Sequence, residues 1–395
     1  MSSEWIGVGL KAIGLFLIHP LFYFMIIMSL LYGYIRVKRE RKAFQTRIED
    51  VYDELKFTYS KGWVLGIFLS VVLVGLGIAL PPGLIVLMAA MTIVFSLFLK
   101  ASALSSAYTL GFSFIAAIGL TYFQVSHSWL PQLSLMNASA VIILLGLLLM
   151  TEGILAYRTA HLRTSPGMVM SARGLLIGQQ RANRLWLVPL VLLMPAGELT
   201  SSLSWWPVLQ VQDQSFSFIC IPYIIGFGQR IQGSLPIVSI QITARRILML
   251  GLVVASLGAA SIWFEPIAWG AVVIAIVGRA FLSWKQRVND NAAPFYFSKR
   301  NQGLMVLGII PNTPAEELKL EIGEVITKVN GLEIKTVSEF YEALQMNRAL
   351  TKLEIIGLNG QTRFEKRASY EGEHHQLGIL FVKDDPQQEQ TAISS

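Results

Sequence analysis

Residues 303–331 read GLMVLGIIPNTPAEELKLEIGEVITKVNG. This is the stretch whose fold the sequence predicts most clearly. The order is an apolar strand, a Pro-marked turn, a short helix, a Gly-Glu turn and a second strand that ends at Asn330 and Gly331. Because turn residues interrupt the apolar runs every few positions, this stretch predicts a small α/β module.

The order and spacing of these elements resembles the PDZ family, in the permuted arrangement common in bacteria. The run GEVITKVNG at residues 323–331 carries the resemblance further than the Gly303-Leu304 pair alone, which on its own would mark only the entry to a strand. The resemblance implies a β-sandwich or barrel with two helices. Thr336 and Glu339 predict a capping box at the second helix, and Asn359-Gly360 predicts a hairpin turn.

The resemblance also implies a peptide groove. The loop before the first strand would hold a carboxylate, because Gly303 leaves room for backbone N–H groups to converge on an anion. A peptide would add along residues 305–310, and the second helix would form the other wall. Whether the groove takes a free C-terminus or an internal segment is left open. The expected binding residues are Asn301, Gln302, Gly303, Leu304, Met305, Val306, Val337, Phe340, Tyr341 and Leu344.

Composition indicates that a membrane domain surrounds this module. The chain is 53% hydrophobic and 14% charged, with a mean hydropathy of +0.55, which is too apolar for an ordinary soluble enzyme. Residues 1–288 carry 21 Lys and Arg against 10 Asp and Glu, whereas residues 289–395 carry 11 against 15. The single Cys220 rules out a disulfide within the chain.

Long apolar runs predict about seven to nine membrane helices within a domain of residues 1–288. A PDZ domain follows at residues 289–383, and a polar tail at 384–395 is expected to be disordered. His19-Pro20 predicts a kink in the first span, and the short run 216–227 is either a helix or a re-entrant segment. The expected spans are residues 10–34, 62–80, 84–99, 104–123, 138–157, 185–203, 216–227, 247–264 and 267–284.

The distribution of Lys and Arg predicts the orientation. Residues 36–61 and 158–184 are rich in basic side chains, so the positive-inside rule places both segments, and with them the PDZ domain, in the cytoplasm. Apolar residues recur at helical spacing between Phe44 and Tyr59, which predicts an amphipathic helix of about four turns. This helix either lies at the lipid interface or offers a docking surface for a partner.

Several enzyme classes lack their motifs in this sequence. None of the five histidines stands in an HExxH pattern, and GxSGG and rhomboid-type GxSG sequences are also missing. Ser96 and Lys100 have the spacing of a Ser/Lys dyad, but a Lys at the end of a span is explained by snorkelling. Glu152, Glu198 and Arg279 are expected to pair between helices or to reach the interface. We therefore expect no enzyme, metal, cofactor or nucleic-acid ligand.

The whole-chain pattern is similar to the MinJ family of division-site determinants in Gram-positive bacteria. The similarity lies in the multi-span N-terminal part, RVKRERKAFQTRIEDVYDELKFTY (36–59), EFYEALQMNRALTKLEIIGLNG (339–360) and YEGEHHQLGILFV (370–382). It implies a membrane scaffold at septum and poles that links a DivIVA-like coiled-coil protein to MinD and MinC, and so restricts FtsZ ring assembly. Other division membrane proteins and the lipid bilayer are the further partners expected. The alternative is a PDZ-bearing intramembrane protease or protease regulator.

Overall fold

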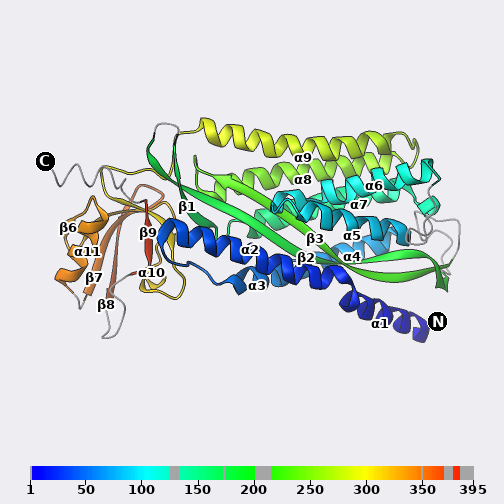
Figure 1. The fold of residues 1–395 in the computed structure, drawn as a ribbon, viewed down its shortest axis with the longest axis horizontal. Coiled ribbons are helices and arrows are strands. Elements are labelled where there is room, and N and C mark those ends of the chain that lie inside the picture. Colours follow the sequence, from blue (N-terminus) through cyan, green and yellow to red (C-terminus); the bar gives the residue numbers. More distant parts are fainter. Residues whose placement is uncertain are drawn as a thin grey trace.

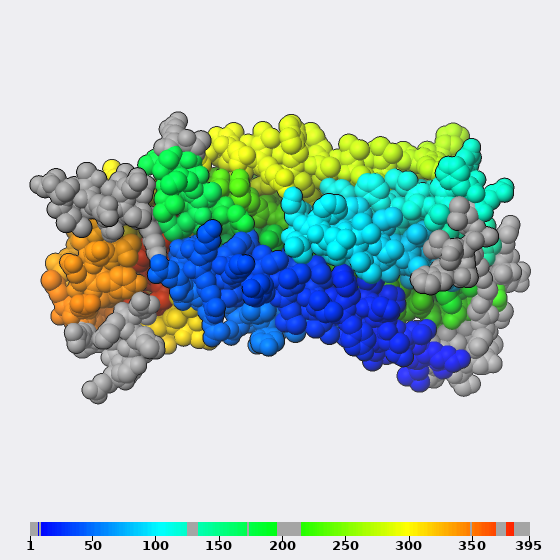
Figure 2. All heavy atoms as spheres, viewed as in Figure 1, coloured from blue at the N-terminus to red at the C-terminus, as the bar shows by residue number. Residues whose placement is uncertain are grey.

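The computed structural model describes residues 2–124, 133–171, 174–200, 215–347, 350–368 and 377–382. The molecule is elongated, with a long helical body and a small sheet domain at one end (Figure 1). The N-terminal helix α1 lies at the opposite end. The space-filling view shows α2, in blue, running along the front of the body toward the small domain (Figure 2).

Nine α-helices build the described part of the helical body. Five helical stretches are long and apolar enough to cross a membrane, namely Pro20–Phe44, Val51–Leu76, Ala138–Thr159, Pro236–Ala260 and Ile267–Ala292. The helices are α1 (Ser2–Ile18), α2 (Pro20–Phe44), α3 (Val51–Lys61), α4 (Trp63–Leu76), α5 (Pro82–Ser96), α6 (Ser106–Tyr122), α7 (Ala138–Thr159), α8 (Pro236–Ala260) and α9 (Ile267–Ala292).

The break expected at His19-Pro20 is confirmed, and it separates α1 from α2. The His19 side chain caps α2, because its Nδ1 accepts from the backbone N–H of Leu21 at 3.2 Å. The continuous amphipathic helix expected from Phe44 to Tyr59 is wrong. Gln45 takes a left-handed φ of 60° that ends α2, and α3 begins only at Val51. A short non-helical segment therefore connects the two helices.

Small residues allow α7 and α8 to pack closely along their length. Gly146 and Gly153 on α7 face α8, and Gly251 and Gly258 on α8 face α7, each pair spaced by seven residues. A Cβ atom at Gly146 would lie 2.4 Å from the backbone N of Ala255, and one at Gly251 would lie 2.6 Å from that of Met150. Close backbone packing at small residues is typical of helices that associate in lipid, because the hydrophobic effect does not drive them together there.

The spans expected at residues 185–203 and 216–227 are wrong, because both runs are β-strands. β2 (Leu176–Thr200) and β3 (Ser215–Ile231) form a long antiparallel hairpin, to which β1 (Ser165–Met170) adds at the base. Pro189 pairs with Pro222 in the middle of the hairpin. A proline inside a helix removes a hydrogen bond and clashes with the preceding turn, whereas two prolines opposite each other in a ribbon are tolerated.

The hairpin lies inside the helical body, with helices on both of its faces (Figure 1). Side chains alternate: Leu185 and Leu187 pack with residues of α1 and α2, while Trp186 and Val188 pack with residues of α7 and α8. Both faces are therefore apolar, and the sequence shows a continuous hydrophobic run instead of an alternation. Such backbone is compatible with membrane depth only where protein covers it.

The outer edge of β2 is closed by α4. Gly62 at the N-cap of α4, and Gly66 and Ser70 within the helix, are spaced by four residues and contact the strand. A Cβ atom at Gly66 would lie 2.5 Å from the Pro189 ring, so only glycine fits there. The Ser70 hydroxyl accepts from the backbone N–H of Val191 at 2.9 Å and donates to the carbonyl of Pro189 at 3.2 Å. The helix thereby satisfies backbone groups that a strand edge would otherwise leave unpaired.

The small domain has a sheet with the strand order β8-β7-β5-β4-β9, and β6 pairs with β5. The expected capping box is confirmed, since Thr336 and Glu339 exchange hydrogen bonds at the start of α11. The elements of the small domain are β4 (Leu304–Ile309), α10 (Pro314–Glu317), β5 (Val325–Val329), β6 (Leu332–Glu333), α11 (Val337–Met346), β7 (Leu350–Ile356), β8 (Thr362–Ala368) and β9 (Ile379–Phe381). The boundary expected after residue 288 falls inside α9.

One face of this sheet packs against the base of the hairpin and the end of α2. The backbone N–H of Gly178 donates to the carbonyl of Phe297 at 2.8 Å, and the Gln180 amide donates to the carbonyl of Leu307 at 2.5 Å. A shared apolar cluster covers these contacts. Its buried members are Phe44, Ile48, Phe297, Met305, Leu307, Val325, Leu380 and Val382.

Candidate functional site

The loop expected to hold a carboxylate is a turn that leads into β4. Asn301 and Gln302 are exposed, whereas Gly303 is buried. A Cβ atom at Gly303 would lie 2.2 Å from the carbonyl oxygen of Ile326, so glycine is required here by the close approach of β5. The backbone N–H of Gly303 donates to the carbonyl of Arg300 at 3.5 Å. Packing within the domain is therefore sufficient to explain Gly303, and its role in holding an anion stays a prediction.

The strand expected to receive a peptide has no free edge. β4 pairs with β5 through Leu304 and Met305 on one side and with β9 from Val306 to Ile309 on the other. A peptide that adds to a sheet needs a strand whose outer backbone groups are unpaired. Addition along residues 305–310 is therefore corrected: Leu304, Met305 and Val306 are buried side chains of an inner strand. The sequence could not show this, because strand order depends on contacts distant in the chain.

The two edges of the sheet differ in chemistry. β8 is one edge strand, and it carries Arg363, Glu365 and Arg367 at alternate positions. Charged side chains on an edge strand disfavour pairing with another strand. β9 consists of Ile379, Leu380 and Phe381, and no described segment pairs with its outer side. The apolar edge at β9 is thus the position in the described sheet where an added strand fits best.

The structure separates the four helix residues that the sequence left undivided. Phe340 is fully buried in the domain core, and its ring contacts that of Phe381 on β9 with centroids 5.0 Å apart. Val337, Tyr341 and Leu344 are half-buried and line one side of α11. The contact with Phe381 places α11 beside β9. These three side chains pack at the margin of the core cluster that contains Ile379 and Phe381, while Phe340 lies inside it.

Glu324, in the turn before β5, is a buried carboxylate. Arg363 binds it with two hydrogen bonds, from Nε to Oε1 at 3.0 Å and from Nη2 to Oε2 at 2.7 Å. This bidentate contact raises the pKa of Arg363 further above its usual range. The pair links β8 to the turn before β5 and has a structural role.

A second cluster of charged side chains lies at the base of the hairpin. Arg36 on α2 contacts Glu40, Glu49 and Glu54 at 2.9, 2.7 and 2.7 Å, and Arg184 on β2 contacts Glu54 at 2.6 Å. All five side chains are buried. Each arginine charge has a carboxylate beside it, so this network ties α2, α3 and β2 together.

The charged side chains of the apolar helices follow the same rule. Glu152 on α7 accepts from Arg279 on α9 at 3.0 Å and from Ser105 at 2.6 Å, which confirms the expected pairing between helices. The side chain of Glu198 lies outside those that the structure describes, as do His374 and His375. Ser96 donates to the carbonyl of Ile93, while Lys100 lines a cavity that Ser96 does not reach. In the described residues no group of three His, Cys, Asp or Glu side chains could hold a metal.

The fold and the open sheet edge define a protein with apolar membrane-type helices and one PDZ domain, and the PDZ domain family model matches residues 305–356. The chain is 60% identical, over its full length and that of the relative, to the cell division topological determinant MinJ of Bacillus subtilis. This chain belongs to the MinJ family. It is also 24% identical to the probable cell division topological determinant MinJ of Lacticaseibacillus paracasei, over 93% of this chain and 98% of that protein.

One solved structure, the PDZ domain of the SdrC-like protein from Listeria monocytogenes, covers 21% of this chain and 90% of its own at 18% identity. The TM-score is 0.18.

Proposed function

We propose that this protein is a membrane scaffold that takes part in selecting the division site. The observation that carries the proposal is the 60% identity to a cell division topological determinant over the whole of both chains. In this role it connects a DivIVA-like polar coiled-coil protein to MinD and MinC, and so keeps FtsZ rings away from the poles. The helical body holds the scaffold in the membrane, and the PDZ domain supplies a recruitment surface.

The recruitment surface of this proposal is the β9 edge together with the exposed side of α11. An extended peptide segment of a partner would pair with the backbone of β9, and Val337, Tyr341 and Leu344 would contact its side chains. The opposite edge is unsuited to pairing because β8 is charged. The loop residues Asn301 and Gln302 are exposed at the entrance to β4 and belong to the same proposal.

A crosslinking pull-down of the full-length protein in its native membrane tests the proposal. We expect a polar coiled-coil protein and a Min-type ATPase among the captured partners. Tyr341→Ala with Leu344→Ala should lower capture at least tenfold, because both side chains border the β9 edge. The matched control is Ser338→Ala with Glu342→Ala, two exposed positions on the other side of α11. Capture of neither partner by the unmodified protein would refute the scaffold function. Equal capture by both variants would leave the scaffold intact and refute the groove.

Orientation forms part of the same proposal, with the PDZ domain and the basic segments on the cytoplasmic side. The charge bias of residues 36–61 and 158–184 supports it. A cysteine introduced at Gln361, in the turn before β8, should react with a membrane-impermeant reagent only after the cells are opened. Cys220 is buried and gives little background. Labelling of intact cells would refute the orientation.

A further inference from the structure

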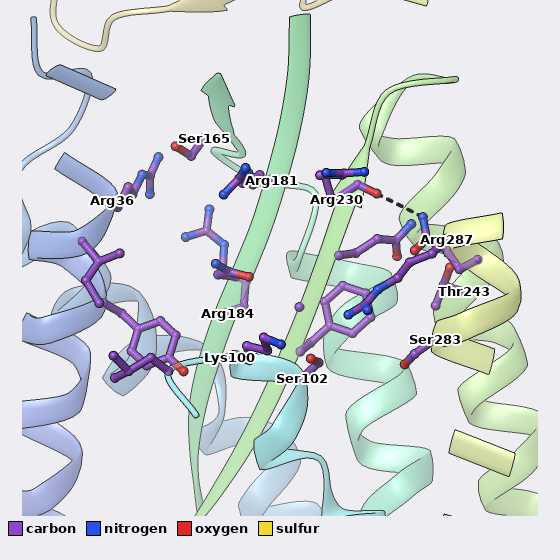
Figure 3. A pocket seen from close by; sticks show the side chains of 18 of the residues that line it. Arg36, Lys100, Ser102, Ser165, Arg181, Arg184, Arg230, Thr243, Ser283 and Arg287 are labelled. Carbon is purple, nitrogen blue, oxygen red and sulfur yellow. Dashed lines mark hydrogen bonds between the residues drawn. The ribbon is translucent and has the colours of Figure 1, made fainter. Parts of the chain in front are cut away.

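A cavity of about 530 Å³ lies where the hairpin passes between α2 and the pair α8 and α9. Figure 3 shows its lining: Arg36 comes from α2, Arg181 and Arg184 from β2, Arg230 from β3, and Arg287 from α9, with Lys100 below them. Its volume is in the range of pockets that bind small molecules or headgroups. It is separate from the PDZ edge and has no part in the function proposed above.

The lining contains nine Lys and Arg side chains and two carboxylates. Four of the cations have carboxylate partners: Arg36, Arg163 and Arg184 belong to the network at the hairpin base, and Arg279 pairs with Glu152. Among the described residues, none of the other five lies within ion-pair distance of a carboxylate. These five are Arg39, Lys100, Arg181, Arg230 and Arg287.

The remaining carboxylate of the lining, Asp290, is engaged by the backbone. It accepts from the N–H groups of Gln232 and Gly233 at 3.0 to 3.1 Å. Five unmatched cations and one carboxylate thus leave a charge of about +4 on the cavity. Lys100, Arg230 and Arg287 are exposed and Arg39 and Arg181 half-buried, so solvent screens part of this charge, and the remainder attracts an anion to the cavity.

Two features show that the excess charge is arranged and not scattered. Arg181 and Arg230 stand directly opposite each other on β2 and β3, a placement that destabilises a sheet when both charges are alike. Arg279 is 1% exposed, and its Nη2 has no hydrogen-bond partner among the described residues, as is true of Nε of the buried Arg184. A buried N–H group without an acceptor is costly, and an oxyanion in the cavity would supply one.

The surroundings of the cavity favour a lipid as the source of the anion. α5 ends at Ser96, and the three residues that follow are apolar and exposed, Leu97 by 75%, Phe98 by 61% and Leu99 by 47%. Leu99 lines the cavity, and Leu97 and Phe98 precede it on the outer surface. Lys100 comes next in the chain and points into the cavity (Figure 3). This segment therefore has apolar side chains on the outer surface of the protein next to a cation inside the cavity. The same arrangement suits a lipid, whose acyl chains contact apolar side chains while its phosphate contacts cations.

We propose that this cavity binds the phosphate group of an anionic phospholipid headgroup. The phosphate oxygens accept from Lys100, Arg181, Arg230 and Arg287 and from the unpartnered Nη2 of Arg279, and the acyl chains lie against Leu97 and Phe98. The hydroxyl of Ser102 also lines the cavity and can donate to the same oxygens. The bound lipid joins α2, the hairpin and α9 through one anion.

Native mass spectrometry of the full-length protein, with added phosphatidylglycerol or phosphatidylcholine, tests this proposal. We expect one phosphatidylglycerol to be retained in preference to phosphatidylcholine. Lys100→Gln with Arg287→Gln should weaken its binding roughly thirtyfold, since each basic residue contributes about fivefold to affinity for an anionic lipid. The matched control, Arg158→Gln with Arg246→Gln, removes two cations that do not line the cavity and should bind as the unmodified protein does.

Three results would overturn the proposal. Equal retention of phosphatidylglycerol by the cavity variant and the control would mean that only the surrounding lipid belt was measured. Displacement of the lipid by millimolar inorganic phosphate or glycerol 3-phosphate would assign the cavity to a soluble anion. A cavity variant that melts below the unmodified protein in neutral detergent would assign the cations to folding. We expect instead that it melts at the same temperature or higher, because like charges have been removed.

Discussion

The molecule contains two sheets that differ at their edges: a helix covers the outer edge of β2 in the hairpin, whereas β9 is an open edge of the PDZ sheet. The hairpin of β2 and β3 has apolar side chains on both faces, helices on both sides, and an outer edge that Ser70 and the glycines of α4 close. The PDZ sheet has one face packed on the hairpin base, one charged edge at β8 and one apolar edge at β9 without a described strand partner. A closed sheet supports a structure, whereas a sheet with one open edge can recruit a strand. The two sheets of this chain therefore differ in whether an edge is left open to an added strand.

The largest effect is expected from breaking the network that anchors the hairpin base. Glu54→Gln removes the carboxylate shared by Arg36 and Arg184, and both arginines are buried. An uncompensated buried charge costs about 3–5 kcal/mol, so we expect the free energy of unfolding to fall by that amount. A thiol-reactive dye can follow unfolding in detergent, because the only cysteine, Cys220, is buried in β3.

The exposed Glu265→Gln is the control for this experiment, and its effect should remain within about 0.5 kcal/mol. If Glu54→Gln changed the unfolding curve no more than Glu265→Gln, the network would not be what holds the hairpin.

A smaller loss is expected from opening the seal between α4 and β2. Gly66→Ala places a methyl group against the Pro189 ring, which must shift, and overpacking of this kind costs about 1–3 kcal/mol. Gly75→Ala in the same helix is the matched control, because nothing lies within 4 Å of its added methyl group. The same dye assay measures both. Equal stability of the two variants would contradict the close contact between α4 and the strand edge.

The smallest effect concerns the PDZ domain and depends on pH. Hydrogen bonds from the backbone N–H groups of Lys335 and Thr336 hold the pKa of Glu339 below its usual range. A carboxylate whose pKa is lower in the folded state stabilises that state above its unfolded pKa, and the stabilisation is lost as pH falls through the folded value. The protection factor of α11, which is its hydrogen-exchange rate corrected for the intrinsic dependence of amide exchange on pH, should therefore fall on acidification.

Glu339→Gln should remove this pH-dependent loss of protection in α11, while the protection of the hairpin peptides responds to pH as before. An equal pH response of α11 in the variant would show that another group is responsible.

The sequence predicted the PDZ elements well because turn residues mark their ends. Asn359-Gly360, the Thr336-Glu339 box and the Pro-marked turn each fix a boundary through local chemistry. It predicted the long helices for the same reason that it failed on the hairpin: a run of apolar residues indicates burial and not geometry. Pro189, Pro195 and Pro222 were the available signal that these runs are not helical.

The site was less predictable, because a groove is defined by neighbours distant in the chain. Val306 looks like an edge residue until β9, more than 70 residues later, pairs with it. Phe340 and Tyr341 are adjacent, and only the position of Phe381 decides which of them faces the core. The cavity gathers Lys100, Arg181, Arg230 and Arg287 from four separate segments, and no spacing in the sequence relates them.

The short connection between α9 and the PDZ sheet leaves little slack. Eleven residues separate Ala292 from Leu304, and within them Phe297 is fully buried and hydrogen-bonded to β2. The PDZ domain is thus fixed rigidly to the helical body and is not tethered to it by a flexible linker. A partner that docked on it would be held at a fixed position and angle relative to the helical body, so the rotational freedom that normally opposes assembly would already be restricted for the next component.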